Sequence, residues 1–345
     1  MQKIAIIGGS IAGNAMALAL SRLGFDVNLY ERSHSALSDR GVGICIPKEL
    51  RHALVKEKFF NHDAKYLEID DRQFVVNDHN HARIIWKQPV NIMAHNWSEI
   101  YSQLHQKLPQ NIYHKGVSVD NISQADNKVT LLLSNGESTT VDWLFCCDGV
   151  NSICRQSLFP DAQLEAAPYI AWRGVIAKDK LNEAQFFERL NYFCYDHGHV
   201  VTYYIPSISG GIELNWVAYQ KLDNSLKQKL LTDKNNQYCL TGIPTNRLTK
   251  WHYTMLDALA DDMPNIFAQA MRSTPSPFIQ NIFDVKVPAL KKGRICLSGD
   301  AAFISRPHTA SGATKALQSA LILSQQLINH NNDLEKATDE PIHLT

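Results

Sequence analysis

The sequence has no excess of charge of either sign, and this limits the partners to expect. Its 345 residues include 34 Lys and Arg against 34 Asp and Glu, and the basic residues form no block along the chain. Nucleic acids and anionic membrane surfaces are bound mainly through basic patches. We therefore expect no nucleic acid and no membrane among the partners.

Paired cysteines and clustered metal ligands are also missing. The seven cysteines form no CxxC motif, and the 14 histidines show neither HExxH nor the Cys-His spacing of zinc sites. An odd number of scattered cysteines is typical of reduced thiols. No uninterrupted run of about 18 apolar residues predicts a membrane span. We expect a cytoplasmic protein without a metal site.

The start of the chain contains the pattern of a dinucleotide-binding unit. An apolar run over residues 3–7 predicts a strand buried on both faces, and Gly8-Gly9-Ser10-Ile11-Ala12-Gly13 follows it directly. Apolar residues at helical spacing continue to Leu23, and a second predicted strand ends at Glu31. Strand, glycine turn, helix, strand and acidic residue together are much more specific than a glycine motif alone.

Each part of this pattern has a physical task. Gly8 permits a tight turn, Gly13 lets the helix pack closely on the strand, and the free N–H groups of the helix N-terminus face a pyrophosphate. Glu31 would accept hydrogen bonds from ribose hydroxyls. Ser10 stands where a glycine is usual, and its hydroxyl would donate to a phosphate.

Two further predicted strands end in turns of small residues. One precedes Asp148-Gly149 and continues as DGxxSxxR to Arg155, and the other, at 294–297, stops at Gly299-Asp300. Each turn alone has an ordinary alternative, a strand-to-helix connection in which the aspartate is a capping residue. Ligands in such folds bind at the carboxyl ends of the strands, so we expect these turns to contribute to one site.

The three motifs, in this order, resemble those of the FAD-dependent aromatic hydroxylases, whose fold is like that of p-hydroxybenzoate hydroxylase. The resemblance rests on GGSIAG with Glu31-Arg32, on CDGVNSICR and on SGDAAFISRPHTASG. Within the family, the sequence is most similar to the 2,6-dihydroxypyridine 3-monooxygenase group. That similarity is carried by residues 171–174, 214–219, 277–280 and 306–310.

The resemblance implies an α/β fold in which a Rossmann-like FAD-binding domain of the glutathione reductase type is interleaved with a β-sheet substrate domain. The FAD-binding domain would be discontinuous. It would consist of residues 1–70, 95–165 and 285–345, and the substrate-binding domain would consist of residues 71–94 and 166–284.

Local patterns add detail to this expectation. They predict helices at 47–60 and 96–108 and hairpins at Asn135-Gly136 and Gly210-Gly211. Residues 40–44, by contrast, do not resemble a regular strand.

The resemblance also implies a set of FAD contacts. Asp300 would bind the ribityl hydroxyls, Pro307 would lie beside the isoalloxazine ring, and the helix that starts near Gly312 would stabilise the negative charge of reduced flavin. The full expected set is Gly8, Ser10, Ile11, Ala12, Gly13, Glu31, Arg32, Gly43, Asp148, Asp300, Pro307, Ala310, Ser311 and Gly312.

The implied activity is hydroxylation of an electron-rich aromatic or hydroxypyridine-type ring. NAD(P)H would bind transiently to reduce FAD, and O2 would then form a C4a-hydroperoxyflavin that transfers oxygen to the ring. Two alternatives stay open: a flavin oxidase or reductase on the same scaffold, and a non-catalytic flavin-binding protein with a shortened C-terminus. A homodimer is the default oligomer.

The substrate side is defined less sharply. Candidate pocket residues are Trp172, Arg173, Tyr203, Tyr204 and Trp216, and for each aromatic residue the alternative is packing in the core of the sheet. His308 is the predicted catalytic residue, because an imidazole beside the flavin could polarise or deprotonate a substrate hydroxyl. Its alternative role is to hold Pro307 in a turn.

The role of His308 can be tested by changing His308→Ala. We expect hydroxylated product to fall about 100-fold or more while NAD(P)H is still oxidised, since a general base contributes at least that factor. Product formation and NAD(P)H consumption would be measured together. Unchanged hydroxylation would remove His308 from the mechanism.

Overall fold

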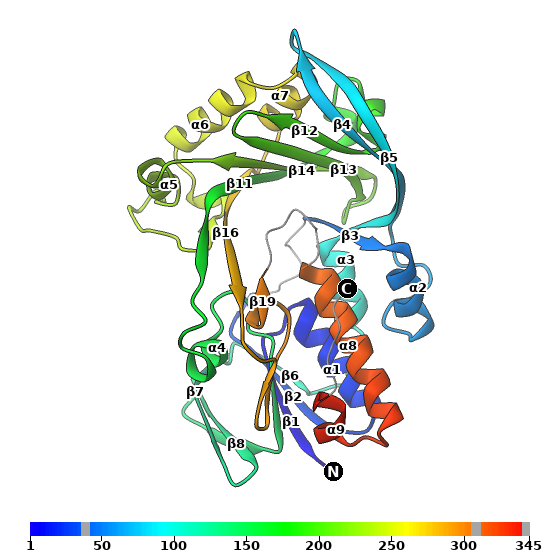
Figure 1. Ribbon diagram of the computed structural model, residues 1–345, viewed down its shortest axis with the longest axis vertical. Coiled ribbons are helices and arrows are strands. Elements are labelled where there is room, and N and C mark those ends of the chain that lie inside the picture. The colour runs from blue at the N-terminus through cyan, green and yellow to red at the C-terminus, as the bar shows by residue number, and fades with distance from the viewer. Residues whose placement is uncertain (36–41, 305–311, 340–345) are drawn as a thin grey trace.

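The chain is built on two β-sheets that alternate along the sequence. The computed structural model describes residues 1–35, 42–304 and 312–339. A mostly parallel sheet lies at the end of the molecule that carries the N-terminus, and a larger mixed sheet lies at the opposite end (Figure 1). The chain passes back and forth between the two sheets, so neither sheet is formed by one continuous segment.

The smaller sheet has the strand order β17-β18-β10-β1-β2-β6. Strand β1, Lys3–Ile7, is buried from Ile4 onward, and β10, Trp143–Cys146, is buried throughout. Burial on both faces is the environment that selects a continuous apolar run, so both predicted strands are confirmed. The other members are β2 at Asp26–Glu31, β6 at Tyr113–Lys115, β18 at Ile295–Leu297 and, antiparallel to β18, β17 at Lys291–Lys292.

Helices cover this sheet. Helix α1, Ile11–Arg22, packs lengthwise against α8, Gly312–Asn329, and also contacts α3, Trp97–His105 (Figure 1). Helix α3 begins where it does because the Asn96 side chain accepts a hydrogen bond of 2.9 Å from the Ser98 N–H. The shorter helices here are α2 at Lys48–Lys56, α4 at Ile153–Leu158 and α9 at Leu334–Asp339.

The larger sheet has the order β15-β16-β11-β14-β13-β12-β4-β5-β3, with β19 paired to β16. Most of its neighbours are antiparallel, and β12 with β4 is a parallel pair. Its strands are β3 Gly43–Pro47, β4 Leu67–Asp78, β5 His81–Asn96, β11 Glu165–Ala177, β12 Leu190–Tyr195, β13 Gly198–Pro206, β14 Ile212–Lys221, β15 Gly242–Ile243, β16 Phe278–Lys286 and β19 Phe303–Ile304.

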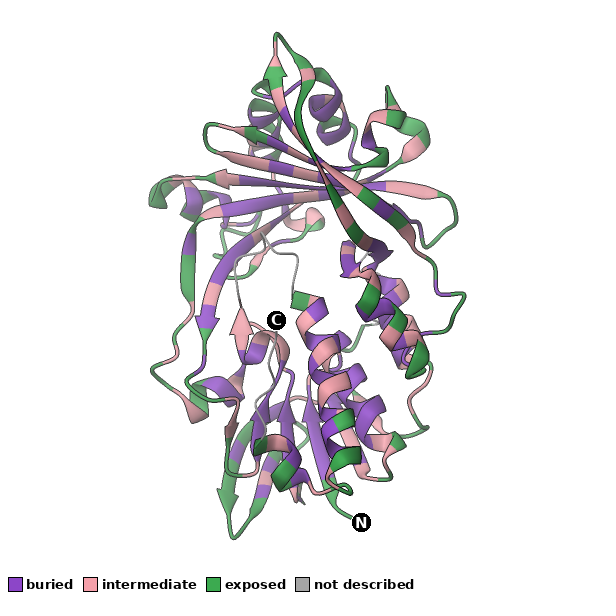
Figure 2. Cartoon of the chain, turned by 45° about the vertical axis from the view of Figure 1, so that its right-hand side comes forward, coloured by how far each residue is buried: buried purple, intermediate pink, exposed green. Residues whose placement is uncertain are grey.

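One face of the larger sheet forms the largest apolar cluster with helices α6, Lys250–Asp261, and α7, Asn265–Arg272. The buried residues concentrate along the middle of the sheet and under these helices, while the β4–β5 tip is exposed (Figure 2). The remaining short elements are α5 at Asn224–Leu230 and single 3-10 turns at Lys178–Lys180, Ala184–Glu188, Thr245–Arg247 and Gly299–Ala301.

Both predicted hairpins are present. Asn135-Gly136 joins β8, Lys128–Leu133, to β9, Ser138–Val141, in a small sheet completed by β7, Val119–Ala125. Gly210 and Gly211, both with positive φ, join β13 to β14. Positive φ is the backbone region that favours glycine, which is why these dipeptides signalled the turns correctly.

The prediction for residues 40–44 was wrong where the structure describes them, because residues 43–47 form β3. This strand pairs antiparallel with the last residues of β5. A Cβ at Gly43 would lie 2.7 Å from the ring of Tyr203, so the close approach of Tyr203 requires glycine here. The strand is specified by partners distant in sequence, and its own residues give little sign of it.

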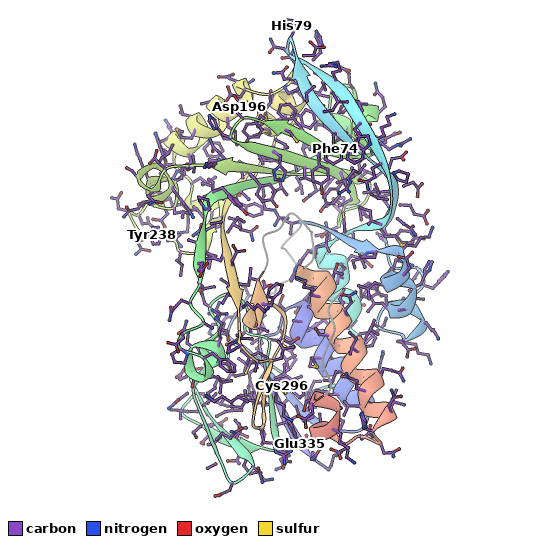
Figure 3. The ribbon with its side chains drawn as sticks, in the orientation of Figure 1. Phe74, His79, Asp196, Tyr238, Cys296 and Glu335 are labelled. Carbon is purple, nitrogen blue, oxygen red and sulfur yellow. The ribbon has the colours of Figure 1, made fainter. Side chains whose placement is uncertain are left out.

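The C-terminal helix of the described chain is held by ion pairs. The Lys291 ammonium lies 2.7 Å from a Glu335 carboxylate oxygen and 2.6 Å from one of Asp339, and Arg294 lies 2.9 Å from Glu335. Glu335 is seen beside the smaller sheet in Figure 3. Within the described residues, no helix has the length and apolarity needed to cross a membrane.

A buried histidine near the end of β5, opposite Ile44 of β3, makes stability depend on pH. His95 of β5 is fully buried, and its Nδ1 is 2.9 Å from the Lys65 carbonyl oxygen, while its buried Nε2 meets no hydrogen-bond partner in the residues that the structure describes. Burial, and then the charge of Arg51, lower the pKa of His95 to about 4. An unfolded chain would bind a proton near pH 6.5, so the folded state loses stability as the pH falls from there toward 4.

We therefore expect the free energy of unfolding to fall by about 3 kcal/mol between pH 6.5 and 4 because of His95 alone. His95→Gln should remove that part of the pH dependence, since an amide can still donate to the Lys65 carbonyl but does not titrate. Urea unfolding at several pH values measures it. An equal slope in the variant and the natural chain would contradict this assignment.

Candidate active site

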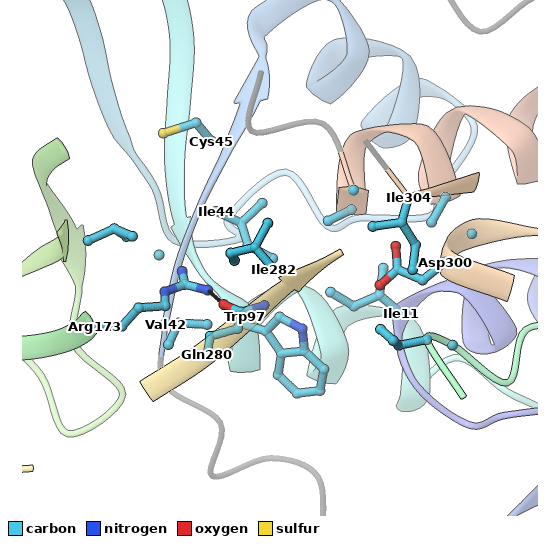
Figure 4. A pocket seen from close by; sticks show the side chains of 18 of the residues that line it. Ile11, Val42, Ile44, Cys45, Trp97, Arg173, Gln280, Ile282, Asp300 and Ile304 are labelled. Carbon is cyan, nitrogen blue, oxygen red and sulfur yellow. Dashed lines mark hydrogen bonds between the residues drawn. The ribbon is translucent and has the colours of Figure 1, made fainter. Parts of the chain in front are cut away.

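A cavity of about 500 Å³ lies where the carboxyl ends of the parallel strands face the larger sheet (Figure 4). The lining from the smaller sheet and its helices is Ser10, Ile11, Ala12, Trp97, Cys147, Gly149, Val150, Gly299, Asp300, Gly312, Ala313 and Ala316. The lining from the larger sheet and its flanks is Val42, Gly43, Ile44, Cys45, Arg173, Tyr192, His199, Val201, Tyr203, Val217, Tyr219, Gln280, Asn281, Ile282, Phe283 and Ile304.

The first turn has the geometry expected of a phosphate-binding turn. Gly8 has a φ of +98°, and a Cβ added at Gly13 would lie 1.8 Å from the Gly8 carbonyl oxygen. The helix therefore packs directly on the turn. Ser10 is the N-cap of α1, and its side chain makes no capping hydrogen bond. The first N–H groups of α1 thus stand at the cavity without side-chain capping.

Glu31 holds this turn in place through hydrogen bonds from backbone N–H groups. One carboxylate oxygen accepts a 2.7 Å hydrogen bond from the Gly9 N–H, and the other accepts one of 2.7 Å from the Ser33 N–H. Glu31 is buried, whereas Arg32 is exposed at the end of β2. Each carboxylate oxygen keeps a lone pair that a ribose hydroxyl could use.

The second and third turns are tied together by Arg155. Its guanidinium is almost fully buried and donates to the backbone carbonyl oxygens of Val150, Asp300 and Ala301. Asp148 accepts a 2.9 Å hydrogen bond from the Ile153 N–H at the start of α4, and its other carboxylate oxygen is buried without a hydrogen-bond partner among the described residues. Burial raises the pKa of Asp148.

Asp300 points toward the cavity next to Ile304 and Ile11 (Figure 4). Burial raises its pKa, and the positive charges of Arg155 and Lys315 oppose that effect. Gly312, at the start of α8, lies close to the Asp300 carboxylate. The predicted site residues Pro307, His308, Ala310 and Ser311 lie outside the described residues.

These features fit a dinucleotide with a flat ring system. A turn that only glycine can form, uncapped N–H groups at a helix start and a ribose-binding acid match an adenosine diphosphate unit. The unpaired oxygen of Asp148 and the carboxylate of Asp300 are acceptors for hydroxyl groups. The small residues Gly312, Ala313 and Ala316 leave room for a planar group at the start of α8.

The opposite wall of the cavity carries donors. Arg173 of β11 donates a 2.9 Å hydrogen bond to the side-chain oxygen of Gln280 on β16 (Figure 4), and within the described part of the chain its buried Nε has no hydrogen-bond partner. Burial raises the pKa of Tyr219 to about 12 and that of Tyr203 well above its usual range, and the charge of Arg173 opposes both shifts. Both phenols therefore stay protonated.

Known proteins are similar to this chain in sequence. A family model described as FAD binding domain-like matches residues 166–284. The chain is 28% identical to 2,6-dihydroxypyridine 3-monooxygenase of Paenarthrobacter nicotinovorans, over 96% of this chain and 84% of the relative. It is 25% identical to salicylate hydroxylase of Pseudomonas putida, over 94% of this chain and 77% of the relative.

A solved structure agrees with these sequence matches. The structure of 2,6-dihydroxypyridine-3-hydroxylase from Arthrobacter nicotinovorans is similar to this chain with a TM-score of 0.90 and 27% identity, covering 98% of this chain and 86% of the other. Sequence and structure together support an FAD-dependent aromatic hydroxylase, similar to 2,6-dihydroxypyridine 3-monooxygenase. FAD is the cofactor of this hydroxylase, and the expected α/β fold with a Rossmann-like FAD-binding unit is confirmed.

Many of the predicted FAD contacts of the hydroxylase lie together at one edge of the cavity. Ser10, Ile11, Ala12, Gly43, Asp300 and Gly312 line the cavity. Gly8, Gly13, Glu31 and Asp148 lie directly behind that lining, in the turns or hydrogen-bonded within them. Arg32 is exposed and is not part of the lining. The individual roles of these residues toward FAD stay predictions.

Three of the five predicted substrate residues lie on the wrong face of the sheet. Trp172, Tyr204 and Trp216 are buried in the cluster under α6 and α7, and their polar atoms bond to Gln220, the Ala184 carbonyl and Thr274. Side chains alternate between faces along a strand, so Arg173 and Tyr203, their direct neighbours, line the cavity instead. Residue type did not reveal which face each side chain occupies, because both faces of this sheet are partly covered.

Sequence reasoning missed several lining residues. Trp97 follows the N-cap of α3, His199 and Tyr219 pair across β13 and β14, and Gln280 lies on β16. Only the register of the sheet places the last three together. Gln280 was within the segment that carried the family resemblance, which is the one signal that could have identified it.

Gly13→Ala tests the first turn. The added methyl would collide with the Gly8 carbonyl, so we expect FAD affinity to fall about 10- to 100-fold as the turn is displaced. FAD binding would be measured by flavin fluorescence titration. As a control, Ala19→Gly in the same helix should cost about 1 kcal/mol of stability and leave FAD affinity nearly unchanged. Equal loss of affinity in both variants would contradict a specific role of the turn.

Proposed function

We propose that this hydroxylase is an NAD(P)H-dependent monooxygenase that adds one oxygen atom of O2 to an electron-rich aromatic ring of the hydroxypyridine or phenol class. The similarity to proteins named for 2,6-dihydroxypyridine and for salicylate supports this substrate class. When bound and reduced, FAD would supply the activated oxygen. The residues of the chain would bind and orient the ring and exclude water.

The proposed substrate class rests on the environment of Arg173. Within the described residues it forms no ion pair with a carboxylate, although it is half-buried and faces the cavity. An unpaired cation in such a site favours an anionic or electron-rich ligand, because leaving it without one has an electrostatic cost. A ring oxyanion or carboxylate would complete the site.

The orientation of Gln280 also favours a substrate with an oxygen acceptor. A guanidinium has no acceptor, so the amide of Gln280 must turn its oxygen toward Arg173, as the 2.9 Å contact shows. Its NH2 group is then available to the cavity. The pair therefore presents donors, and it would select a substrate with an oxygen acceptor at this end of the ring.

The rest of the wall suits a flat ring. Val42, Ile44, Ile282 and Phe283 provide apolar lining around the polar pair. Such surroundings exclude water, which strengthens each hydrogen bond to the substrate and protects a reactive oxygen species from solvent. The FAD site and the Arg173–Gln280 pair lie on opposite sides of one cavity (Figure 4), so the ring would be held between cofactor and sheet.

We also propose that one part of the chain binds FAD and the other binds the substrate. We assign residues 1–70, 95–165 and 285–345 to FAD binding and residues 71–94 and 166–284 to substrate binding. The strands β11 to β14 and β16 within 166–284 contribute Arg173, Tyr219 and Gln280 to the cavity. The strands of the smaller sheet contribute the three turns.

The proposed function predicts that 2,6-dihydroxypyridine or a related phenol stimulates NADH or NADPH oxidation by the FAD-loaded protein, with isotopic oxygen from O2 appearing in the product. Arg173→Met should raise KM for an acidic ring about 10- to 100-fold, since a hydrogen bond to a charged group contributes about 1.5–3 kcal/mol. Oxygen consumption and product mass are the measurements.

The outcomes separate the competing functions. Substrate oxidation without incorporation of isotopic oxygen would indicate an oxidase or reductase. FAD binding without stimulated oxidation, across a broad panel of phenols and hydroxypyridines, would indicate a non-catalytic flavoprotein. An unchanged KM in Arg173→Met would contradict the anion-binding role while leaving the activity intact.

A further inference from the structure

Among the described lining residues of the cavity, one is a histidine on the sheet side. His199 of β13 faces the cavity together with Val201 and Tyr203, as the alternation along the strand requires. Its ring centroid lies 4.7 Å from that of Tyr219 and 6.2 Å from that of Tyr192, and both tyrosines also line the cavity. The imidazole is half-buried between two phenol rings.

The proposed reaction needs a group that accepts a proton. Oxygen transfer to an aromatic ring is faster when a ring hydroxyl is ionised, because the oxyanion pushes electron density into the ring. The acceptor must lie in the cavity, within hydrogen-bond reach of the hydroxyl. It must also be neutral at the working pH and able to return the proton to water.

The other described lining residues do not meet this need. Arg173 has no acceptor atom, and Gln280 does not titrate. Burial keeps the phenols of Tyr192, Tyr203 and Tyr219 and the thiols of Cys45 and Cys147 protonated, since it raises the pKa of each. Asp300 lies on the side assigned to FAD.

We infer that His199 is the proton acceptor for the substrate hydroxyl, and this inference rests on the proposed function. The substrate O–H bond breaks, an N–H bond forms on the imidazole, and the bound oxyanion is stabilised by the Arg173 guanidinium two strands away in the same wall. After product leaves, the half-buried imidazole passes the proton to water.

The side chains around His199 come from neighbouring strands of the larger sheet. Among the described residues, its neighbours include Cys194 across the β12–β13 pair and the rings of Tyr192 from β12 and Tyr219 from β14, and Arg72 of β4 lies over the ring of Tyr192. Cys194 is the direct cross-strand neighbour and is exposed.

The test uses the FAD-loaded protein and two variants. His199→Gln keeps a polar side chain that cannot take a proton, and His199→Phe keeps ring packing between the two tyrosines. We expect kcat to fall about 100-fold at neutral pH in both, with KM little changed. The defect should disappear at a pH where the substrate is already ionised, a recovery that a purely structural role would not produce.

A second readout does not depend on turnover. Bound 4-nitrophenol reports its own ionisation by the visible absorption of the phenolate. The natural protein should hold it ionised at a lower pH than in water, and both His199 variants should lose most of that shift. His197→Gln is the matched control, since His197 is exposed in the turn before β13 and is not part of the lining.

Two results would overturn the inference. One is a preserved ionisation shift in both His199 variants, and the other is loss of the shift in His308→Gln with normal behaviour of the His199 variants. If no substrate stimulates NAD(P)H oxidation but the shift depends on His199, the proposed function fails while the acceptor role of His199 is supported.

Discussion

The cofactor side of the cavity depends on the buried guanidinium of Arg155. This side chain joins the turn after β10 to the turn after β18 by donating to backbone carbonyl oxygens in both. The carboxylates of Asp148 and Asp300 lie near enough to offset part of the cost of burying its charge. A buried cation whose terminal N–H groups donate to fixed backbone carbonyl oxygens holds its surroundings in one arrangement, because a shift would break those hydrogen bonds. The positions of Val150 and Asp300 in the cavity wall follow from this link.

The other side of the cavity follows from the pleat of the larger sheet. Each strand presents one set of side chains to the cluster under α6 and α7 and the alternate set to the cavity. Trp172 and Trp216 thereby stabilise the sheet, while Arg173 and Tyr219 line the cavity. The sheet thus carries a rigid core on one face and polar groups on the other. Groups on neighbouring strands, such as His199 and Tyr219, are held at fixed spacing by the backbone hydrogen bonds between those strands.

Prediction from the sequence succeeded where the pattern is local. The unit from β1 to Glu31 is specified by contiguous residues, because a tight turn, a helix start and a buried strand each leave a recognisable signature. The Asn135-Gly136 and Gly210-Gly211 turns were found for the same reason. Strand β3 was missed, because Gly43 is explained by the side chains of Tyr203 and Asn215, which come from distant strands. The pocket candidates were chosen by residue type, and type does not reveal which face of a strand a residue occupies.

The sequence by itself determined the dinucleotide-binding unit, the three turns of small residues and their order, and through them the family. These features are encoded in short segments whose backbone geometry only glycine and a few small or acidic residues satisfy. The tertiary structure alone decided which side chains meet across the cavity. The pairing of Arg173 with Gln280, the link from Arg155 to two turns and the place of His199 between two tyrosines all join residues far apart in the chain. Their contacts depend on strand register and sheet face, which are set by the packing of the whole sheet and leave no mark in any single segment.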